Sequence, residues 1–587
     1  MSFLWSKLQE IYTDRLINIR GDHSLNLNSQ IVVQPSWSVI YNYADLTSLE
    51  GVTWYDEKIA ISHIKPVFSH AEKLVIVGDL WLSNRQQLQQ RLGVNSLSDT
   101  EIIAYLWELE GMACLNLLEG MFVFTVWDRE NQQLYLVRDR VGSRTIYYTN
   151  NGLNRAIAPR LKTLAPYHQK DLDLIALRDY LCCAFVPGEQ TLWQNVRELR
   201  PGTSLILPDE KMQIYWQPQE NICHQEKPLE WHSKQLRSLL ELVVNEYLPN
   251  DEPVGVFLSG GIDSSCITAL AAKLHNYPVH TYSIHFGSEY PNELEFANLV
   301  AQHCHTEHHI LEIKPDILWE KLPQAIAHLD DPIGEGLTVP NLLVGEWAKN
   351  FVNVVLNGEG GDPCFGGPKN QPMLLNSLYS TVTNQNQTDL LSAYLTSFKK
   401  CFLDLSQLLK PEIWAKIQQE SSIFSPDLNA TDITYLNRLM LINIKFKGAD
   451  YILTKVNNFT QGTGLQGRSP LFDQRIVEMS MQIPPEYKLY GAEEKAVLKQ
   501  SVADLLPEVI LKRPKSGMMM NMQQWFRLIW QKEARYLLLN KKAAIAPYLN
   551  QNLIREWLDY RGQLWPRYGV LLWLLVSLEI WLQVNKK

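Results

Sequence analysis

The stretch Pro-Val-Gly-Val-Phe-Leu-Ser-Gly-Gly-Ile-Asp-Ser-Ser, residues 253–265, decides the fold of this chain. Residues 253–258 are apolar and partly β-branched and predict a buried strand, and residues 266–274 predict a helix. A strand, a glycine-rich turn and a helix N-terminus form an anion site, because unpaired backbone N–H groups point outward and glycine lets a phosphate approach closely. Three serine hydroxyls add donors, and Asp263 can hold a cation.

A second glycine-rich stretch, Asn-Gly-Glu-Gly-Gly-Asp at residues 357–362, follows an apolar run at 352–357 that predicts another strand. In parallel sheets, ligands bind at the carboxyl ends of the strands, so the two loops are expected at one edge of a sheet. Asp263 and Asp362 can then share one Mg²⁺, which needs only one or two carboxylates besides phosphate oxygens. The magnesium ion would neutralise the negative charge of the bound phosphate groups.

The remaining sequence predicts two domains joined by a linker. Residues 1–210 hold two predicted helices, at 84–92 and at 99–109, with Asp99 at the N-cap of the second. The same region holds strand-like runs at 31–33, 73–77, 121–127, 133–137 and 204–207. The stretch 208–228 is polar with three prolines, so we place the linker at 211–229.

Residues 230–587 form the second predicted domain. Strand-like runs at 253–258, 279–286 and 352–357 alternate with helical stretches, the first of them at 230–247. This alternation predicts a parallel sheet with helices on both faces. The apolar stretch 568–581 contains Glu579 and is too short to span a bilayer, so it predicts a buried C-terminal helix.

Composition narrows the classes of partner. The net charge is −9 without a long basic run, so a nucleic acid is not expected as a principal partner. None of the eight cysteines forms a Cys-x-x-Cys pair, which argues against a disulfide framework or a zinc ribbon and favours a reducing compartment. No signal peptide is recognised at the start of the sequence. We therefore expect a cytoplasmic protein without a membrane partner.

The motifs together resemble the asparagine synthetase superfamily, whose Ser-Gly-Gly-Ile-Asp-Ser-Ser loop is that of the ATP pyrophosphatases. Further matching motifs lie at 358–367, 467–473, 494–499 and 514–517, and in the first domain at 119–124, 138–142 and 201–202. The resemblance implies an α+β N-terminal-nucleophile-type αββα sandwich, glutaminase-like, over residues 1–210. It implies an α/β ATP-pyrophosphatase domain with a parallel sheet and a helical C-terminal part over 230–587.

The resemblance also implies roles for individual residues. Lys495 matches the lysine that stabilises the transition state of amide formation, and Glu359 matches the glutamate that takes a proton from the attacking amine. ATP and Mg²⁺ are the implied cofactors, with Asp263 and Asp362 as the metal ligands. The implied ATP and pyrophosphate contacts are Leu258, Ser259, Gly260, Gly261, Asp263, Ser264, Ser265, Ile284, Asn357 and Gly358.

The sequence departs from this family in several places. Asparagine synthetase uses an N-terminal cysteine, whereas position 2 here is Ser2 and the first cysteine is Cys114. His-Ile-Lys-Pro at 63–66 stands in the region of the family's glutamine-holding Arg-Gly-Pro-Asp, and residues 78–84 also differ. We expect the first domain to keep its fold without glutaminase chemistry. In the second domain, Pro363 and Gln466 each replace an acidic residue of the family.

These observations predict an ATP-dependent, AMP-forming amide ligase that joins a substrate carboxylate to a substrate amine. The favoured subclass is a peptide or natural-product cyclase resembling the lasso-peptide cyclases and β-lactam synthetases. An asparagine synthetase using free ammonia and a nucleotide-binding pseudoenzyme are the alternatives. Two kinds of partner are left open. One is a precursor peptide with its peptidase, and the other is a second copy of the chain in a homodimer. Specificity is expected from residues 370–460 and from the loop at 331–332.

Overall fold

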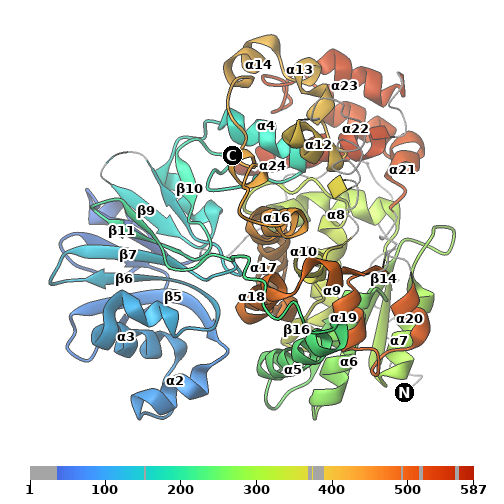
Figure 1. The fold of residues 1–587 in the computed structure, drawn as a ribbon. Helices are drawn as coiled ribbons and strands as arrows, with labels where there is room; N and C mark the ends of the chain where they lie inside the picture. The colour runs from blue at the N-terminus through green and yellow to red at the C-terminus, as the bar shows by residue number, and fades with distance from the viewer. Residues whose placement is uncertain are drawn as a thin grey trace, which may run out of the picture.

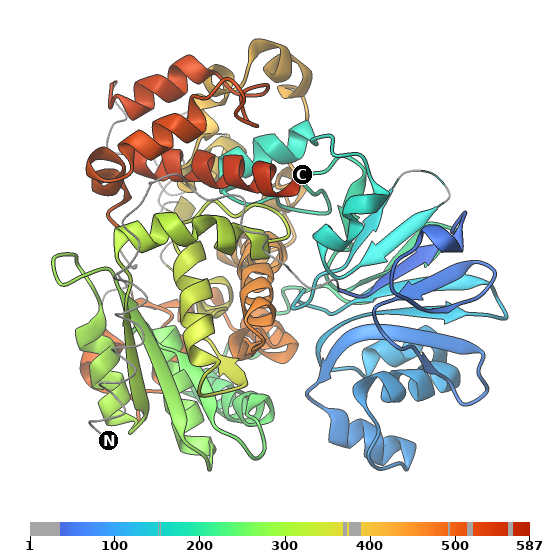
Figure 2. The same cartoon turned by 180° about the vertical axis from the view of Figure 1, so that it is seen from behind.

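The computed structural model describes residues 36–150, 152, 154–367, 373–374, 389–490, 493–513, 520–561 and 567–586. These residues form a sheet-rich N-terminal lobe beside a larger lobe that is rich in helices (Figures 1 and 2). Ser2, the run at 31–33 and the motif at 514–517 lie outside the described residues.

Two six-stranded sheets build the N-terminal lobe, and all their strand pairs are antiparallel. The first has the order β10(Val196–Glu198)-β8(Tyr147–Thr149)-β9(Arg155–Ala158)-β1(Ser38–Tyr41)-β3(Ile59–Ser62)-β2(Val52–Tyr55). The second has the order β12(Lys211–Ile214)-β11(Thr203–Leu207)-β7(Gln133–Arg138)-β6(Gly120–Asp128)-β5(Leu74–Leu82)-β4(Val67–Phe68). Buried side chains from both sheets, such as Val39, Ile61, Val77 and Trp127, form one cluster between them. Strand β12 carries this lobe to Ile214, past the predicted linker start at 211.

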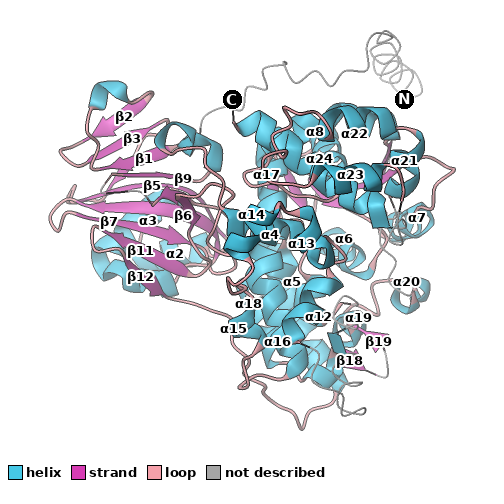
Figure 3. Cartoon of the chain, turned by 90° about the horizontal axis from the view of Figure 1, so that it is seen from above, coloured by secondary structure: helices cyan, strands magenta, loops and turns pink. Residues whose placement is uncertain are grey.

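Helices cover the outer faces of these sheets. α2(Arg85–Leu92) and α3(Asp99–Glu110) lie on the second sheet, where α3 packs against β5. The first sheet packs against η3(Leu161–Tyr167), and α4(Leu174–Cys183) belongs to the same apolar cluster, which continues into the larger lobe. Seen from above, the sheets of this lobe stand to one side of the helices of the larger lobe (Figure 3).

The N-cap of α3 corrects one prediction. Ser98 caps the helix, because its hydroxyl accepts the N–H of Glu101 while the Glu101 carboxylate accepts the N–H of Ser98. Asp99, the predicted cap, is instead buried and ion-paired with Arg85 at 2.5 Å. Both Ser and Asp are favoured N-caps, so the tertiary contact of Asp99 decided between two adjacent candidates.

The larger lobe is built on a five-stranded parallel sheet, which confirms the predicted sheet type. Its order is β15(Glu307–Glu312)-β14(Val279–His285)-β13(Val254–Phe257)-β16(Val354–Leu356)-β17(Gln466–Arg468). The two edge strands, β15 and β17, were not among the predicted strands. Helices cover both faces: α5(Leu229–Tyr247), α6(Ile262–Leu274) and α7(Leu294–His303) on one, and α9(Thr338–Ala348) with α17(Thr454–Gly462) on the other.

The C-terminal part is helical and packs around one apolar helix, α24(Tyr568–Asn585). Length and composition alone would let α24 cross a membrane, but 78% of its apolar window is buried inside the protein. The buried Glu579 carboxylate accepts the N–H groups of Ala544 and Ile545, each at 2.9 Å. α24 is therefore a core helix, as predicted, with its one acidic side chain satisfied by backbone donors.

Further elements complete the larger lobe. They are α8(Pro315–His328), α10(Gly361–Phe365), α12(Leu390–Ser397), η5(Phe402–Asp404), α13(Leu405–Leu408), α14(Pro411–Ile417), α15(Ser425–Leu428), α16(Tyr435–Ile442), the π-helical η6(Asn443–Leu453), η7(Pro470–Phe472), α18(Gln474–Gln482), η8(Pro485–Tyr487), β18(Leu489–Tyr490), β19(Glu493–Glu494), α19(Ala496–Ser501), α20(Glu508–Lys512), α21(Met522–Leu528), α22(Gln531–Leu538) and α23(Gln551–Leu558). The N-terminal lobe adds η1(Leu46–Ser48) and η2(Gly111–Asn116).

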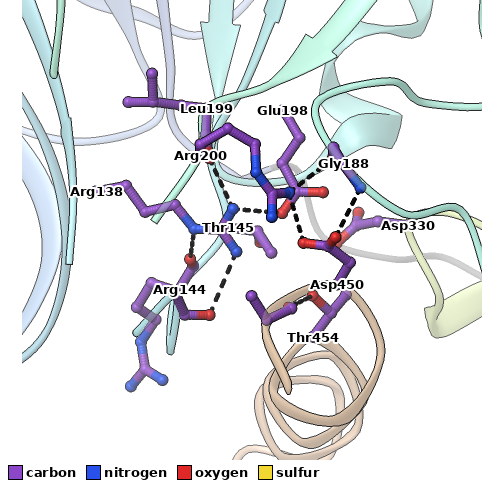
Figure 4. Close-up of polar contacts among 12 residues, drawn as sticks. Arg138, Arg144, Thr145, Gly188, Glu198, Leu199, Arg200, Asp330, Asp450 and Thr454 are labelled. Atoms are coloured by element: carbon purple, nitrogen blue, oxygen red, sulfur yellow. Dashed lines mark hydrogen bonds and ion pairs between the residues drawn. The ribbon is translucent and has the colours of Figure 1, made fainter. Parts of the chain in front are cut away.

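A buried polar network joins the two lobes (Figure 4). Asp450 of η6 accepts hydrogen bonds from the Arg200 guanidinium and from the Gly188 N–H, both at 2.7 Å, and its carboxylate is fully buried. Arg138 pairs with Glu198 at 2.7 Å in the same network. Burial raises the pKa of Glu198 to about 7, although Arg138 opposes that shift. The junction therefore depends on charges that compensate one another away from water.

Removing one of these charges is expected to destabilise the junction. Arg200→Ala leaves the buried Asp450 carboxylate without its cation, and breaking a buried pair costs about 3–5 kcal/mol. Arg197→Ala is the matched control, because Arg197 is more weakly paired, 3.9 Å from Asp173, and should cost less than about 1 kcal/mol. Urea unfolding of both variants measures the difference, and equal losses would show that the Arg200–Asp450 pair does not hold the junction.

Candidate active site

The two glycine-rich loops pack directly against each other at the carboxyl ends of β13 and β16. A Cβ atom on Gly358 would lie 2.4 Å from the backbone nitrogen of Ser264, and one on Gly361 would lie 2.1 Å from the Asp263 carboxylate. Gly260 has φ +76° and its Cβ would lie 2.6 Å from the backbone nitrogen of Ala297. Only glycine permits these approaches, so the glycines set how closely the two loops meet.

Lys495 lies between the two aspartates that the sequence predicts as metal ligands. Its Nζ atom is 2.5 Å from Asp263 Oδ2 and 2.6 Å from Asp362 Oδ1, and its side chain is fully buried. Burial alone would lower the pKa of Lys495, but the two carboxylates raise it above its ordinary value, so the ammonium stays charged. Asp263 and Asp362 lie in the first turns of α6 and α10, and Lys495 precedes α19 with φ +56°.

The aspartates also fit a magnesium ion. Oxygens of both carboxylates converge on one cationic atom, so the site is already arranged around a positive charge. Mg²⁺ takes hard oxygen ligands and commonly uses one or two carboxylates together with phosphate oxygens and water. When bound by Asp263 and Asp362, the ion would supply charge neutralisation for the polyphosphate. We propose that Asp263 and Asp362 are the side chains that bind this ion.

A pocket of about 270 Å³ opens beside this cluster, where β13, β14 and β16 end. Eight of the predicted site residues line it: Leu258, Ser259, Asp263, Ser264, Ile284, Asn357, Gly358 and Glu359. Gly260, Gly261, Ser265, Asp362 and Lys495 are not in the lining, and the Ser265 side chain is fully buried in α6. The pocket therefore joins both loops, and the Lys495 cluster adjoins it through Asp263.

Residues that the sequence reasoning did not single out form another wall of the pocket. Lys455 of α17 lines it, and its ammonium lies 2.6 Å from the Glu335 carboxylate and 4.9 Å from the Tyr451 ring centroid. The Tyr451 hydroxyl donates to the same carboxylate. Burial would lower the pKa of Lys455, but Glu335 and Glu359 raise it, so a charged lysine faces the pocket.

Two sequence signals could have found this wall. Tyr451 and Lys455 are four residues apart and so share one face of a helix. Glu335 lies four residues beyond Asp331, in the loop from which specificity is expected. Of these three residues, Lys455 lines the pocket, and Glu335 and Tyr451 hold its ammonium from behind.

The rim of the phosphate loop also holds an arginine. Arg513 donates to the Gly260 carbonyl at 3.0 Å, pairs with Glu293 and lies 3.9 Å from the Phe296 ring centroid. It comes directly before the motif at 514–517. Pro363, the departure from the family, lies buried in the short helix α10, beside Asp362.

Lys488 is another buried lysine near the site. Lys488 Nζ donates to Asn437 Oδ1 at 2.5 Å, and burial lowers its pKa from the ordinary 10.5 to about 7. Between pH 7 and 10.5 the Lys488 amine is therefore protonated in the unfolded chain but neutral in the folded protein. Over this range the free energy of unfolding rises with pH. The free-energy cost of burying the Lys488 charge is full at and below pH 7 and disappears toward pH 10.5.

Lys488→Met is accordingly expected to stabilise the protein. At pH 7 it removes the penalty at the cost of one hydrogen bond, with a net gain on the order of 3 kcal/mol. The gain should shrink at pH 9, because the wild-type protein recovers stability there. Urea unfolding at both pH values measures it, with Lys499→Met as the control. A gain independent of pH would show that charge burial at Lys488 is not the cause.

The parallel sheet, the paired glycine loops at its carboxyl edge and the buried lysine between their aspartates are the features expected of a ligase of the ATP-pyrophosphatase class. A family model described as asparagine synthase matches residues 235–583, and a model of the glutamine amidotransferase domain matches residues 59–217. Because the first match covers more than half of the sequence, the chain belongs to the asparagine synthase family. It is a carbon–nitrogen ligase that forms AMP and pyrophosphate.

Individual relatives agree with this assignment. Asparagine synthetase [glutamine-hydrolyzing] 1 of Bacillus subtilis is 24% identical over 540 residues, covering 86% of this chain and 84% of that protein. Asparagine synthetase [glutamine-hydrolyzing] 3 of the same organism is 29% identical over 446 residues, covering 71% and 70%. A solved NH3-dependent NAD synthetase from Campylobacter jejuni aligns over 33% of this chain and 92% of its own, with 15% identity and a TM-score of only 0.18.

Proposed function

We propose that this ligase uses ATP to adenylate a substrate carboxylate and then joins it to an amine that is not released from glutamine. The observation that carries the proposal is the Asp263–Lys495–Asp362 cluster, which places one buried ammonium and two carboxylates beside a pocket at the carboxyl edge of the sheet. The serine hydroxyls and the N-terminus of α6 bind the leaving pyrophosphate. Lys495 stabilises the negative charge that develops there.

Glu359 is placed to assist the second half of the reaction. It follows β16, lines the pocket, and its N–H donates to the Asn357 side chain at 3.0 Å, which fixes the loop. In this proposal its carboxylate takes the proton that the amine loses on attacking the acyl adenylate. The charged Lys455 faces the same pocket and orients an anionic group of the substrate.

The first lobe supports a nitrogen source other than glutamine. Asp79 stands in the segment 78–84 that departs from the family, and its carboxylate is held by Arg144 at 3.2 Å and by Gln461 of the larger lobe at 2.5 Å. A carboxylate that already binds Arg144 and Gln461 at the lobe junction is not available to hold a ligand. We therefore favour an amine carried by the substrate itself as the nitrogen source, as in the lasso-peptide cyclases that the sequence resembles.

A second candidate is an asparagine synthetase that uses free ammonia. The names of the relatives favour asparagine as the product, because both Bacillus subtilis proteins are called asparagine synthetases, although both names also state glutamine hydrolysis. In this case aspartate is the carboxylate, and Lys455 contacts its second carboxylate. The two candidates share every step up to the adenylate and differ only in the substrate that fills the pocket.

Product formation with defined nitrogen donors distinguishes the candidates. The purified protein is given ATP, Mg²⁺ and either aspartate or peptides with internal Asp or Glu, together with ammonium, glutamine or no added donor. AMP and amide products are measured by mass spectrometry. Amide formation in a peptide without added donor supports the cyclase, and asparagine formed from ammonium supports the second candidate. Asparagine or amide formed only with glutamine, with release of glutamate, would overturn the proposed nitrogen source.

A further inference from the structure

A group of potential metal ligands lies toward the amino-terminal ends of β14 and β15, next to Tyr282, which lines the pocket. His280 near the start of β14 pairs in register with Glu307 at the start of β15, and His309 follows two residues later. Because successive strand side chains alternate between faces, these three share one face, toward Trp347 of α9. Ile284 and His285, which line the pocket, lie at the other end of β14.

The spacing of the three ligand atoms fits a tetrahedral ion. His280 Nδ1 lies 3.1 Å from His309 Nε2 and 3.5 Å from Glu307 Oε2, and all three atoms lie within 4.8 Å of one another. Zinc bonds of about 2.0–2.1 Å in tetrahedral geometry place ligand atoms roughly 3.3 Å apart. The contact between the two histidines and the ion pair between His280 and Glu307 bring the three groups together, as ligands of one ion would be.

The surrounding residues hold the two imidazoles in place. The His309 ring stacks on Tyr282, with centroids 5.0 Å apart and planes at 13°, and it lies 4.6 Å from the Phe351 ring. His280 is buried, whereas the Glu307 side chain is 63% exposed. Two fixed nitrogen ligands and one solvent-facing carboxylate leave room for a water as the fourth ligand. Rings that are fixed by packing form a preorganised ligand pair.

We propose that His280, Glu307 and His309 bind a divalent transition metal ion of the zinc type. Imidazole nitrogen and carboxylate oxygen are common ligands of Zn²⁺. The ion would link β15, one of the two edge strands, to β14, and so stabilise an edge beside which no further strand lies in the described part of the chain. It lies away from Asp263 and Asp362, so it has a structural role and takes no part in the ligase reaction. This site does not depend on the proposed function.

Metal titration of the chelator-treated full chain tests the proposal. Co²⁺ serves as a spectroscopic probe, because tetrahedral Co²⁺ gives intense visible absorption, and Zn²⁺ should displace it at one ion per chain. Zn²⁺ should also raise the unfolding temperature. His280→Ala and Glu307→Gln should each weaken Co²⁺ binding at least about tenfold, since even changes to outer partners of metal ligands cost about 10–100-fold. Glu307→Gln changes an exposed side chain and keeps the fold.

His308→Ala is the matched control. His308 lies between Glu307 and His309 on the same strand, but its Nδ1 bonds to Thr281 at 2.9 Å on the other face of the sheet. The His308→Ala substitution should leave the Co²⁺ absorption and the Co²⁺ affinity unchanged. The proposal is overturned if the chain gives no tetrahedral Co²⁺ spectrum. It is also overturned if Glu307→Gln binds as tightly as the wild-type chain, or if His308→Ala loses as much affinity as His280→Ala.

Discussion

Lys495→Ala is expected to reduce amide formation by about 10²–10³-fold while changing ATP affinity far less. Lys495 is the cation that lies within hydrogen-bonding distance of both Asp263 and Asp362, and it is shielded from water. An electrostatic group in such a position acts on charge that develops in the transition state, so its loss falls on the rate. Rapid-quench measurement of product, with calorimetric measurement of ATP binding, separates the two effects.

Lys499→Ala is the control for that experiment. Lys499 lies one turn further along, in α19, and pairs with Glu493 at 3.1 Å, away from both aspartates. It should keep the wild-type rate. Lys495→Ala also leaves two carboxylates facing each other without a cation, so some stability should be lost. If the rate falls no further than the folded fraction does, Lys495 has only a structural role.

The second large effect is expected for Asp263→Asn, which should reduce pyrophosphate release by at least about 10²-fold. The substitution keeps the shape of the side chain but removes one of two negative charges that attract Mg²⁺ and hold Lys495. The loss should be partly reversed by raising the Mg²⁺ concentration if the metal role is correct. Circular dichroism should show an unchanged fold.

Asp504→Asn makes the same chemical change at an exposed side chain that pairs with Arg237, and it should have no effect on pyrophosphate release. Wild-type release from Asp263→Asn would exclude Asp263 from the reaction. A large loss that no Mg²⁺ concentration reverses would instead assign Asp263 to holding Lys495 alone.

Local signals were sufficient for the centre of the larger lobe. The run at 253–258 became β13 because apolar, β-branched residues fit a strand buried on both faces. The helix after it was predicted from 266, but α6 begins at Ile262, because the loop residues Asp263 and Ser264 already lie in its first turn. Both glycine loops were found because their glycines are required by close packing, and this requirement is visible in sequence.

The edges of the same sheet were not predictable in this way. β15 carries Glu307, His308 and His309, polar residues that an edge strand tolerates because one side faces solvent. β17 has only three residues, one of them a glycine, and it forms because it pairs with β16 across a long sequence separation. Tertiary contacts of this kind override local propensity.

The pocket shows the same difference between local sequence signals and long-range contacts. Its glycine-loop side was predicted, because a motif of adjacent residues defines it. On its other wall, Lys455 is held by Glu335, which lies 120 residues away in the sequence, and a pairing of this kind becomes visible only in the folded chain. Side chains brought together over such separations determine which substrate fits, so the sequence indicates the ligase chemistry more directly than its substrate.

ATP–pyrophosphate isotope exchange tests the central claim, that the two glycine loops and Lys495 form one adenylating site. Purified protein is incubated with ATP, Mg²⁺, labelled pyrophosphate and a panel of carboxylates from aspartate to short peptides. We expect label in ATP that depends on one class of carboxylate and disappears in Asp263→Asn and Lys495→Ala. Carboxylate-dependent exchange that persists undiminished in both variants would contradict this claim, because the adenylate would then form elsewhere.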